Sequence, residues 1–146
     1  MGKKTKAALG VIAALLVVIQ FFPPERTNPP SDPAASFEAV VKPPAQVSAI
    51  VARACQNCHS HRTVWPWYSR VAPASWLVVD DVVSARRKMN FSAWARMSPE
   101  RAQEVLGDMC QEVKAGDMPL WQYRLLHLEA KLSAEDVAAV CTLSPR

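Results

Sequence analysis

The chain has 146 residues, half of them hydrophobic, and a formal net charge of +4. This length suits one small domain with attached segments, and the hydrophobic content allows a packed core. From Ala45 onward, twelve basic residues stand against ten acidic ones. Such a balance argues against a nucleic-acid surface, which needs clustered cations.

The first element is an apolar segment near the N-terminus. Lys3, Lys4 and Lys6 precede an uncharged run from Ala7 to Phe22. A helix of this length spans roughly 24 Å, and snorkelling lysines or local thinning would complete a ~30 Å hydrocarbon core. A cleaved signal peptide is the alternative, but the run ends without an Ala-x-Ala site. Residues 1–22 are therefore predicted to be an uncleaved membrane anchor.

The lysines also set the expected orientation, because positively charged flanks stay in the cytoplasm. We therefore expect a single-pass membrane protein whose domain lies outside the cytoplasm. That compartment is oxidising, which changes how the cysteines are interpreted.

Residues 23–44 hold seven of the twelve prolines. Proline lacks the backbone donor that helices and central strands need, so this stretch is predicted to be a semi-rigid extended linker without helix. It would reach up to roughly 70 Å at the rise of a polyproline helix.

Residues 45–146 are predicted to form one all-α domain. Apolar spacing indicates a helix over Gln46–Cys55 and another from Pro99, capped by Ser98, to a stop at Gly116. Ser75–Lys88 has local strand character but the length of a helix, and we interpret it as helix. Ser133 to Asp136 resembles a capping box that begins a last helix ending near Leu143.

Cys55-Gln56-Asn57-Cys58-His59 is the C-x-x-C-H signature of covalent haem attachment. Two thiols one helical turn apart reach the two vinyl groups of one porphyrin edge, and the following imidazole binds the iron. Three alternatives fit less well. A redox dithiol would follow a strand of a βαβ unit, a zinc site would need a second ligand pair, and a disulfide this short would stabilise little. The sequence thus predicts one covalent haem c.

A six-coordinate iron needs a second axial ligand, and Met118 is the favoured candidate. It lies in Gly116-Asp117-Met118-Pro119, just after a predicted helix end, where a loop stiffened by proline would hold a thioether in place. His127 is the main alternative. A methionine ligand would raise the reduction potential and a histidine would lower it.

Other residues would support the cofactor. Aromatic rings following the motif would cover the porphyrin and exclude water, and Trp65 and Tyr68 are the first candidates to donate to a propionate. Arg70 is the candidate cation for a propionate, with Arg62, Arg86 and Arg87 as alternatives. Cys110 and Cys141 lie on the apolar faces of two predicted helices and are expected to pair in an oxidising compartment, although two buried free cysteines remain an alternative.

Several of these motifs, taken in order, resemble the bacterial "haem-binding domain" family. The resemblance covers nearly everything after the linker and implies a monohaem c-type domain, often exported and membrane-tethered. For a bacterial family this implies an anchor in the cell inner membrane and a haem domain that faces the periplasm. Cys110 and Cys141 lie outside the family pattern. The motifs are Cys55 to His59, Trp65 to Ser69, Ala72 to Leu77, Asn90 to Trp94, Met118 to Leu120 with Tyr123, Leu126-His127, and Ala130 to Ser133.

The sequence therefore predicts a membrane-tethered c-type cytochrome that carries single electrons between redox partner proteins and is not an enzyme. Two other functions remain open. If Met118 does not bind the iron, a five-coordinate haem would suit an enzyme or gas sensor, with His127, Arg124 or Tyr123 beside the ligand. Alternatively, the haem would stabilise the small core of an assembly subunit.

Overall fold

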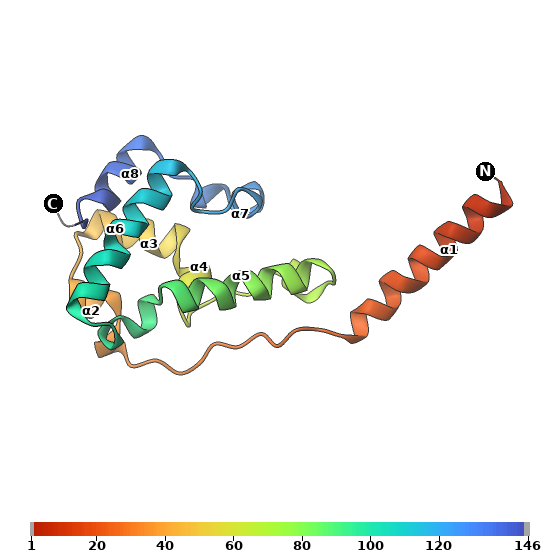
Figure 1. The fold of residues 1–146 in the computed structure, drawn as a ribbon, viewed down its shortest axis with the longest axis horizontal. Coiled ribbons are helices and arrows are strands. Elements are labelled where there is room, and N and C mark those ends of the chain that lie inside the picture. The colour runs from red at the N-terminus through yellow and green to blue at the C-terminus, as the bar shows by residue number, and fades with distance from the viewer. Residues whose placement is uncertain (1, 145–146) are drawn as a thin grey trace.

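The structure is a computed structural model that describes residues 2–144. Over those residues it is all-helical, as the sequence predicts. The first helix, α1 (Lys3–Val18), continues into a 3₁₀ turn, η1 (Ile19–Phe21), and projects away from the other helices (Figure 1). None of the α1 residues is buried, so its apolar side chains find no partner within the domain.

The segment after α1 differs from the predicted linker. Residues 22–32 are extended, but they run along the domain and not away from it (Figure 1). A 3₁₀ turn, η2 (Pro33–Ala35), and a helix, α2 (Phe37–Val41), follow. The prediction of a helix-free spacer is therefore wrong. Ser36 caps α2 by accepting a hydrogen bond from the Ala39 backbone, and Phe37 has no exposed surface, so burial of one aromatic ring outweighs the neighbouring prolines.

Phe37 belongs to the main core, which also draws on α3 (Ala45–Ala54), η4 (Phe91–Arg96), α6 (Pro99–Ala115) and α8 (Ala134–Cys141). The ring of Phe37 meets Phe91 edge-on at 5.1 Å and Trp94 at 4.8 Å between centroids. Phe91 and Trp94 stack on each other. Aromatic pairs in such geometries stabilise the fold beyond the free energy that comes from burying their surface area.

The predicted helices are present with bounds close to those expected. The ambiguous stretch forms α5 (Ala74–Lys88), which buries Val79, Val82 and Ala85 on one side. Ser98 caps α6, and Gly116 ends it in the left-handed conformation, with φ of 78°. The capping box at Ser133 is formed. The helix α7 (Trp121–Leu126) and the 3₁₀ turn η5 (Leu128–Ala130) were not predicted.

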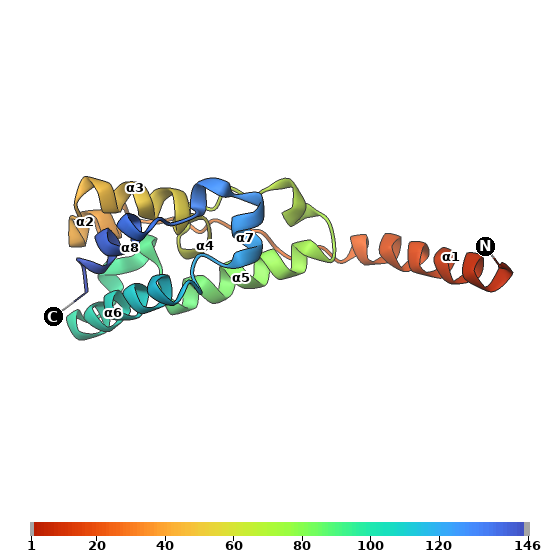
Figure 2. The same cartoon turned by 90° about the horizontal axis from the view of Figure 1, so that it is seen from above.

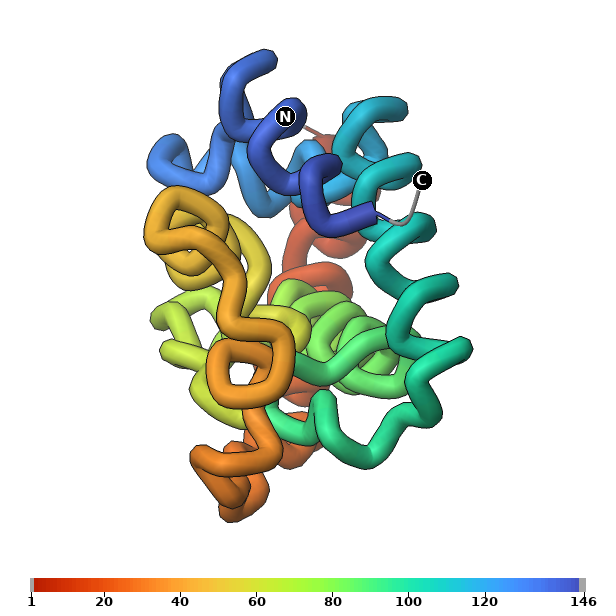
Figure 3. The backbone as a smooth tube through the Cα atoms, turned by 90° about the vertical axis from the view of Figure 1, so that its left-hand side faces the viewer, coloured from red at the N-terminus to blue at the C-terminus, as the bar shows by residue number. Residues whose placement is uncertain are grey.

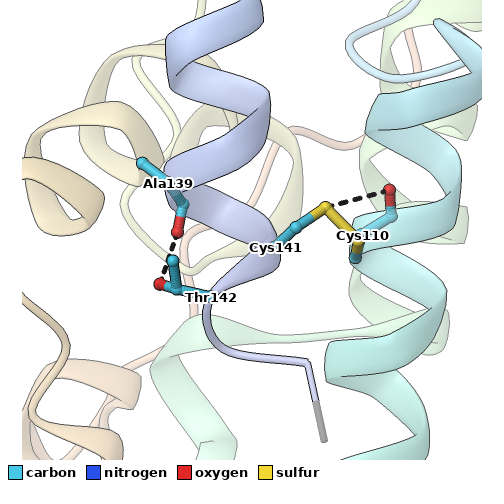
Figure 4. Close-up of a disulfide and its surroundings, with 4 residues drawn as sticks. All are labelled: Cys110, Ala139, Cys141 and Thr142. Atoms are coloured by element: carbon cyan, nitrogen blue, oxygen red, sulfur yellow. Dashed lines mark hydrogen bonds between the residues drawn. A yellow bond between two sulfur atoms is a disulfide. The ribbon is translucent and has the colours of Figure 1, made fainter. Parts of the chain in front are cut away.

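α6 and α8 are joined by a disulfide between Cys110 and Cys141, with the two Cα atoms 4.8 Å apart (Figure 4). Seen from the end opposite α1, α3 and α6 lie on opposite sides, α8 lies above and α5 lies below (Figure 3). α7 lies over part of α5 in Figure 2 but apart from it in Figure 1, and residues of both helices line one of the cavities described below. The space enclosed by α3, α5, α6 and the loop after α6 holds the candidate site.

Candidate haem site

The C-x-x-C-H motif forms one tight turn of helix, α4 (Gln56–His59), directly after α3. The backbone N–H groups of Cys58 and His59 both donate to the carbonyl of Cys55, at 3.2 and 3.0 Å. This turn presents the motif side chains to one cleft, because Cys55, Cys58 and His59 each line part of it. Both cysteines are free thiols.

The cleft consists of three cavities that share lining residues. The largest, of about 350 Å³, is lined by Cys55, His59 and Met118, and we call it the methionine cavity. A middle cavity of about 210 Å³ is lined by Cys58, His59 and Met118. The third, of about 170 Å³, shares Cys58 with the middle cavity and is lined by Tyr68 and Tyr123, and we call it the tyrosine cavity. Most of the remaining lining is apolar: Ala54, Met89, Val105, Met109, Val113, Pro119, Ala85, Leu120, Leu77, Val78, Val82 and Leu126.

The imidazole of His59 is oriented by the backbone. Its Nδ1 lies 3.2 Å from the carbonyl oxygen of Met89. Because a carbonyl only accepts, Nδ1 carries the hydrogen and Nε2 keeps its lone pair. Burial lowers the pKa of His59, which further favours the neutral ring. A neutral imidazole held through Nδ1 is the form in which histidine binds a metal.

The two thiols differ from those of a redox dithiol. Burial is the main cause that raises the pKa of Cys55 to about 12 and that of Cys58 to about 11. Reactive dithiols depend instead on a lowered thiol pKa. Residues 2–144 also hold no cluster of three or more histidine, cysteine or acidic side chains suited to a metal ion. The raised thiol pKa values thus argue against a redox dithiol.

Met118 is held against the cleft by the end of α6. The backbone N–H groups of Asp117 and Met118 donate to the carbonyl of Glu112, at 3.1 and 3.3 Å, and the Arg124 guanidinium donates to the carbonyl of Gly116 at 3.3 Å. Met118 lines both cavities that His59 lines. The loop therefore brings a thioether to the same space as the imidazole, across 59 residues of sequence.

His127 has a different environment. Its Nε2 lies 2.7 Å from the hydroxyl of Tyr68, and its Nδ1 lies 3.0 Å from a carboxylate oxygen of Glu129. Because the carboxylate accepts from Nδ1–H, Nε2 accepts from the tyrosine, and both ring nitrogens are engaged. His127 lines only the tyrosine cavity among the three. Burial raises the pKa of Tyr68 to about 12, which keeps its hydroxyl a donor.

Sequence reasoning missed the role of Asn57 in the cleft, and it considered its partner Tyr123 only for a five-coordinate haem. Asn57, inside the C-x-x-C-H motif, donates from Nδ2 to the hydroxyl of Tyr123 at 2.8 Å and accepts from the Val64 backbone at 3.1 Å. It thereby ties α4 to α7 and to the following loop. Tyr123 in turn stacks on the His127 ring at 4.1 Å. Tyr123 stands in the C-terminal family motif, but nothing in the sequence pairs it with Asn57.

Only some of the residues that were predicted to bind a propionate line the cleft. Tyr68 lines the tyrosine cavity, whereas Trp65 and Arg70 line none of the three cavities, and Arg70 is exposed on η3 (Trp67–Arg70). The cations that do line the cleft are Lys88, in the methionine and middle cavities, and Arg101, in the methionine cavity. Sequence reasoning did not single out these two cations, which share the lining of the methionine cavity with the carboxylates of Asp108 and Glu112.

A model of the haem-binding domain family matches residues 14–143. The chain therefore belongs to this family and is a haem-binding protein, as the sequence motifs predict. No curated protein and no solved structure shows significant similarity to it. The residues present fit the cofactor: two free thiols, an imidazole with an available lone pair and a largely apolar cleft gather around one space.

Proposed function

We propose that this protein is a membrane-anchored c-type cytochrome that moves single electrons on the periplasmic side of the inner membrane. The observation that carries the proposal is that His59 and Met118 line the same two cavities, with Cys55 and Cys58 on their walls. When bound, a haem with two protein ligands supplies a one-electron iron couple.

In this proposal each residue has a distinct task. Cys55 and Cys58 would hold the porphyrin through thioethers, and His59 would bind the iron through Nε2 while the Met89 carbonyl holds Nδ1. Met118 would supply the second protein ligand. The apolar residues around it exclude water, which raises the reduction potential. The protonated thiols and the neutral imidazole carry no charge into the cleft before loading.

The proposal of a membrane anchor is supported by α1 and the 3₁₀ turn η1 that continues it. Lys3–Phe21 has 19 residues with a mean hydropathy of 1.7 and is long and apolar enough to cross a membrane. At 1.5 Å per residue it spans about 28 Å, close to a ~30 Å hydrocarbon core. The lysines at its start favour a cytoplasmic N-terminus and a periplasmic domain.

Absorption spectra of the full-length protein in its membrane fraction test the proposal. We expect a low-spin spectrum, a pyridine derivative typical of two thioethers, and retention of the pigment by the polypeptide in acidified acetone. The oxidised protein should show the weak red charge-transfer band of Met–iron ligation. Met118→Ala should abolish that band, whereas Met97→Ala, which alters a methionine outside the three cavities, should retain it. A colourless protein or an extractable pigment would contradict covalent attachment.

A second candidate function is a five-coordinate haem enzyme or gas sensor. It is favoured by one observation, which is that the hydroxyl of Tyr123 and the Tyr68–His127 pair stand beside the cleft. A high-spin spectrum in the wild-type protein, unchanged in Met118→Ala, would favour this function over electron transfer.

A further inference from the structure

We infer that the end of the haem domain nearest α1 rests on the bilayer surface, with Trp67 and Trp76 in the lipid headgroup region. The inference rests on the proposed membrane anchor and goes beyond it. An anchor alone would leave the domain free to move at the end of a tether, whereas this surface would fix the height and orientation of the cleft above the membrane.

The first support is a set of hydrogen bonds that join the end of the anchor to the domain. The Gln20 side chain donates to the carbonyl of Ala72 at 3.0 Å and accepts from its N–H at 2.9 Å. The indole N–H of Trp76 donates to the carbonyl of Phe22 at 2.8 Å. Gln20 and Phe22 lie at the C-terminal end of the membrane-spanning candidate, and Figure 1 shows this end next to the start of α5.

These bonds decide where the domain lies. If Lys3–Phe21 spans the bilayer, then Gln20 and Phe22 lie at its periplasmic boundary. The residues bonded to them, Ala72 and Trp76, must lie at that boundary too. Farther along the chain, the Arg26 guanidinium donates to the carbonyl of Ser69 at 3.0 Å, which holds η3 against the same segment.

The second support is the apolar surface that this end exposes. Trp67 meets the Tyr68 ring edge-on at 5.8 Å between centroids but is still 75% exposed, which leaves most of a large apolar ring in water. Tryptophan is enriched where membranes meet water, because its ring is apolar and its N–H is polar. Further exposed apolar side chains lie at the end of the anchor and between η3 and the first turn of α5: Phe21, Phe22, Val71 and Leu77.

The charge of this surface suits lipid headgroups. Between Glu38 and Asp80 the chain has no acidic residue, and Arg70 is exposed on η3 beside Trp67. Near the end of the anchor, the one carboxylate of Glu25 is followed by the cation of Arg26. Asp80 and Asp81 follow Trp76 by one turn of α5, so the cations of Arg70 and Arg26 are the groups of this surface that would attract anionic phosphates.

A second copy of the chain or a partner protein would also cover apolar side chains. The bilayer is favoured because the hydrogen bonds to Gln20 and Phe22 bring this end to the membrane whether or not any other protein is present. The other two occupants are outcomes of the test.

Fluorine NMR of the full-length holoprotein in lipid nanodiscs tests the inference. The protein carries 5-fluorotryptophan at its five tryptophans, each signal being assigned with a Trp→Phe variant. The relaxation rate of each fluorine signal is compared between discs whose chelating lipid holds gadolinium and discs in which the same lipid holds diamagnetic lanthanum. We expect the gadolinium to speed relaxation at Trp67 and Trp76 several-fold more than at Trp121, which is 65% exposed but lies on α7, farther from α1 (Figures 1 and 2).

The matched variant removes the bonds to the anchor. Gln20→Ala combined with Trp76→Phe should reduce the gadolinium effect at Trp67 several-fold while the haem spectrum stays unchanged. Gln46→Ala, at an exposed glutamine on α3, should leave that effect as in the wild type.

The outcomes separate this inference from the anchor proposal. A protein that enters the discs but gives equal effects at Trp67 and Trp121 overturns the inference and leaves the anchor intact. If the gadolinium effect at Trp67 is small in discs shown to hold two copies, a second copy of the chain covers the surface. If the effect becomes small only after a periplasmic extract is added, a partner protein covers it. Failure to enter the discs overturns both proposals.

Discussion

The carboxylate of Asp136 has two partners at the start of α8. It accepts from the backbone N–H of Ser133 at 2.8 Å and pairs with the Arg53 guanidinium at 2.7 Å, which links α8 to α3. These interactions, the Ser133 backbone hydrogen bond foremost, lower the pKa of Asp136 below its ordinary value of 3.8. The ionised form is thus the one that the folded state stabilises.

This shift predicts how the free energy of unfolding depends on pH. The contribution of Asp136 is fully present above pH 3.8 and is lost as the pH falls through the lower folded-state pKa. Asp136→Asn should therefore destabilise the protein at neutral pH and flatten the acid limb of its stability profile, measured by urea unfolding at several pH values. Glu135→Gln, at an exposed neighbour, serves as the control. An acid limb as steep in Asp136→Asn as in the wild type would contradict the assignment.

Residue by residue, the sequence predicts the cleft where a short local pattern specifies it. Cys55, Cys58 and His59 form a motif within five positions, and Met118 stands out because it follows a helix stop and precedes proline. The Asn57–Tyr123 hydrogen bond joins residues 66 positions apart, and Lys88 and Arg101 line the cleft only because α5 and α6 pack around it. Such contacts depend on tertiary packing, which local patterns do not report.

Among the elements, α2 was the one whose existence contradicted the sequence prediction. Proline density predicted an extended segment, and the prolines do flank α2, but Ser36 and Phe37 supply a cap and a core contact between them. By contrast, α6 and α8 were predicted because their caps and apolar stripes agree over many residues. A five-residue helix gives too short a stripe for periodicity to reveal.

The importance of α2 can be measured. Phe37→Ala removes a fully buried ring that contacts Phe91 and Trp94, and it should lower the free energy of unfolding by about 3–5 kcal/mol. Val40→Ala, at an exposed position of the same helix, should cost much less. Chemical denaturation of the two variants checks this, and a comparable small loss in both would mean that α2 contributes little to the core.

The disulfide is the covalent link between two elements. It closes a loop across a sequence separation of 31, which in the chain-entropy model stabilises the folded state by about 3–4 kcal/mol. The double variant Cys110→Ala, Cys141→Ala should lose about that amount in guanidinium unfolding while keeping its bound haem. If the double variant were as stable as the wild type, the pair would be acting only as two small buried side chains.

At the scale of the whole molecule, Arg86 joins the N-terminal segment to the domain. Its guanidinium donates to the carbonyl of Thr27 at 2.9 Å, to the side chain of Asn28 at 3.0 Å and, on the domain side, to the carbonyl of Ser60 at 2.7 Å. Asn28 itself donates to the carbonyl of Thr63 at 2.9 Å. Residues 22–32 therefore form a strap along the domain, where the sequence predicted a free spacer.

Removing this contact should release the strap. Arg86→Leu should make residues 22–32 more susceptible to limited proteolysis and lower the free energy of unfolding by about 2–3 kcal/mol, as expected for losing hydrogen bonds to a charged group. Arg87→Leu is the matched control, because Arg87 is exposed and its guanidinium donates to the Ser84 side chain of the same helix and not to residues 22–32. Mass spectrometry of the fragments identifies the cut sites, and equal cleavage in the two variants would show that Arg86 does not hold the strap.

The four cysteines place opposite demands on the compartment in which the protein matures. If haem attaches covalently as proposed, Cys110 and Cys141 have to be oxidised to a disulfide while Cys55 and Cys58 stay reduced until the haem is bound. All four belong to a domain of about a hundred residues. An unselective oxidant would form disulfides among all four cysteines, and an unselective reductant would break the Cys110–Cys141 disulfide. Production of the mature protein should therefore depend on a reducing factor that distinguishes the Cys55–Cys58 turn from the bridge between α6 and α8.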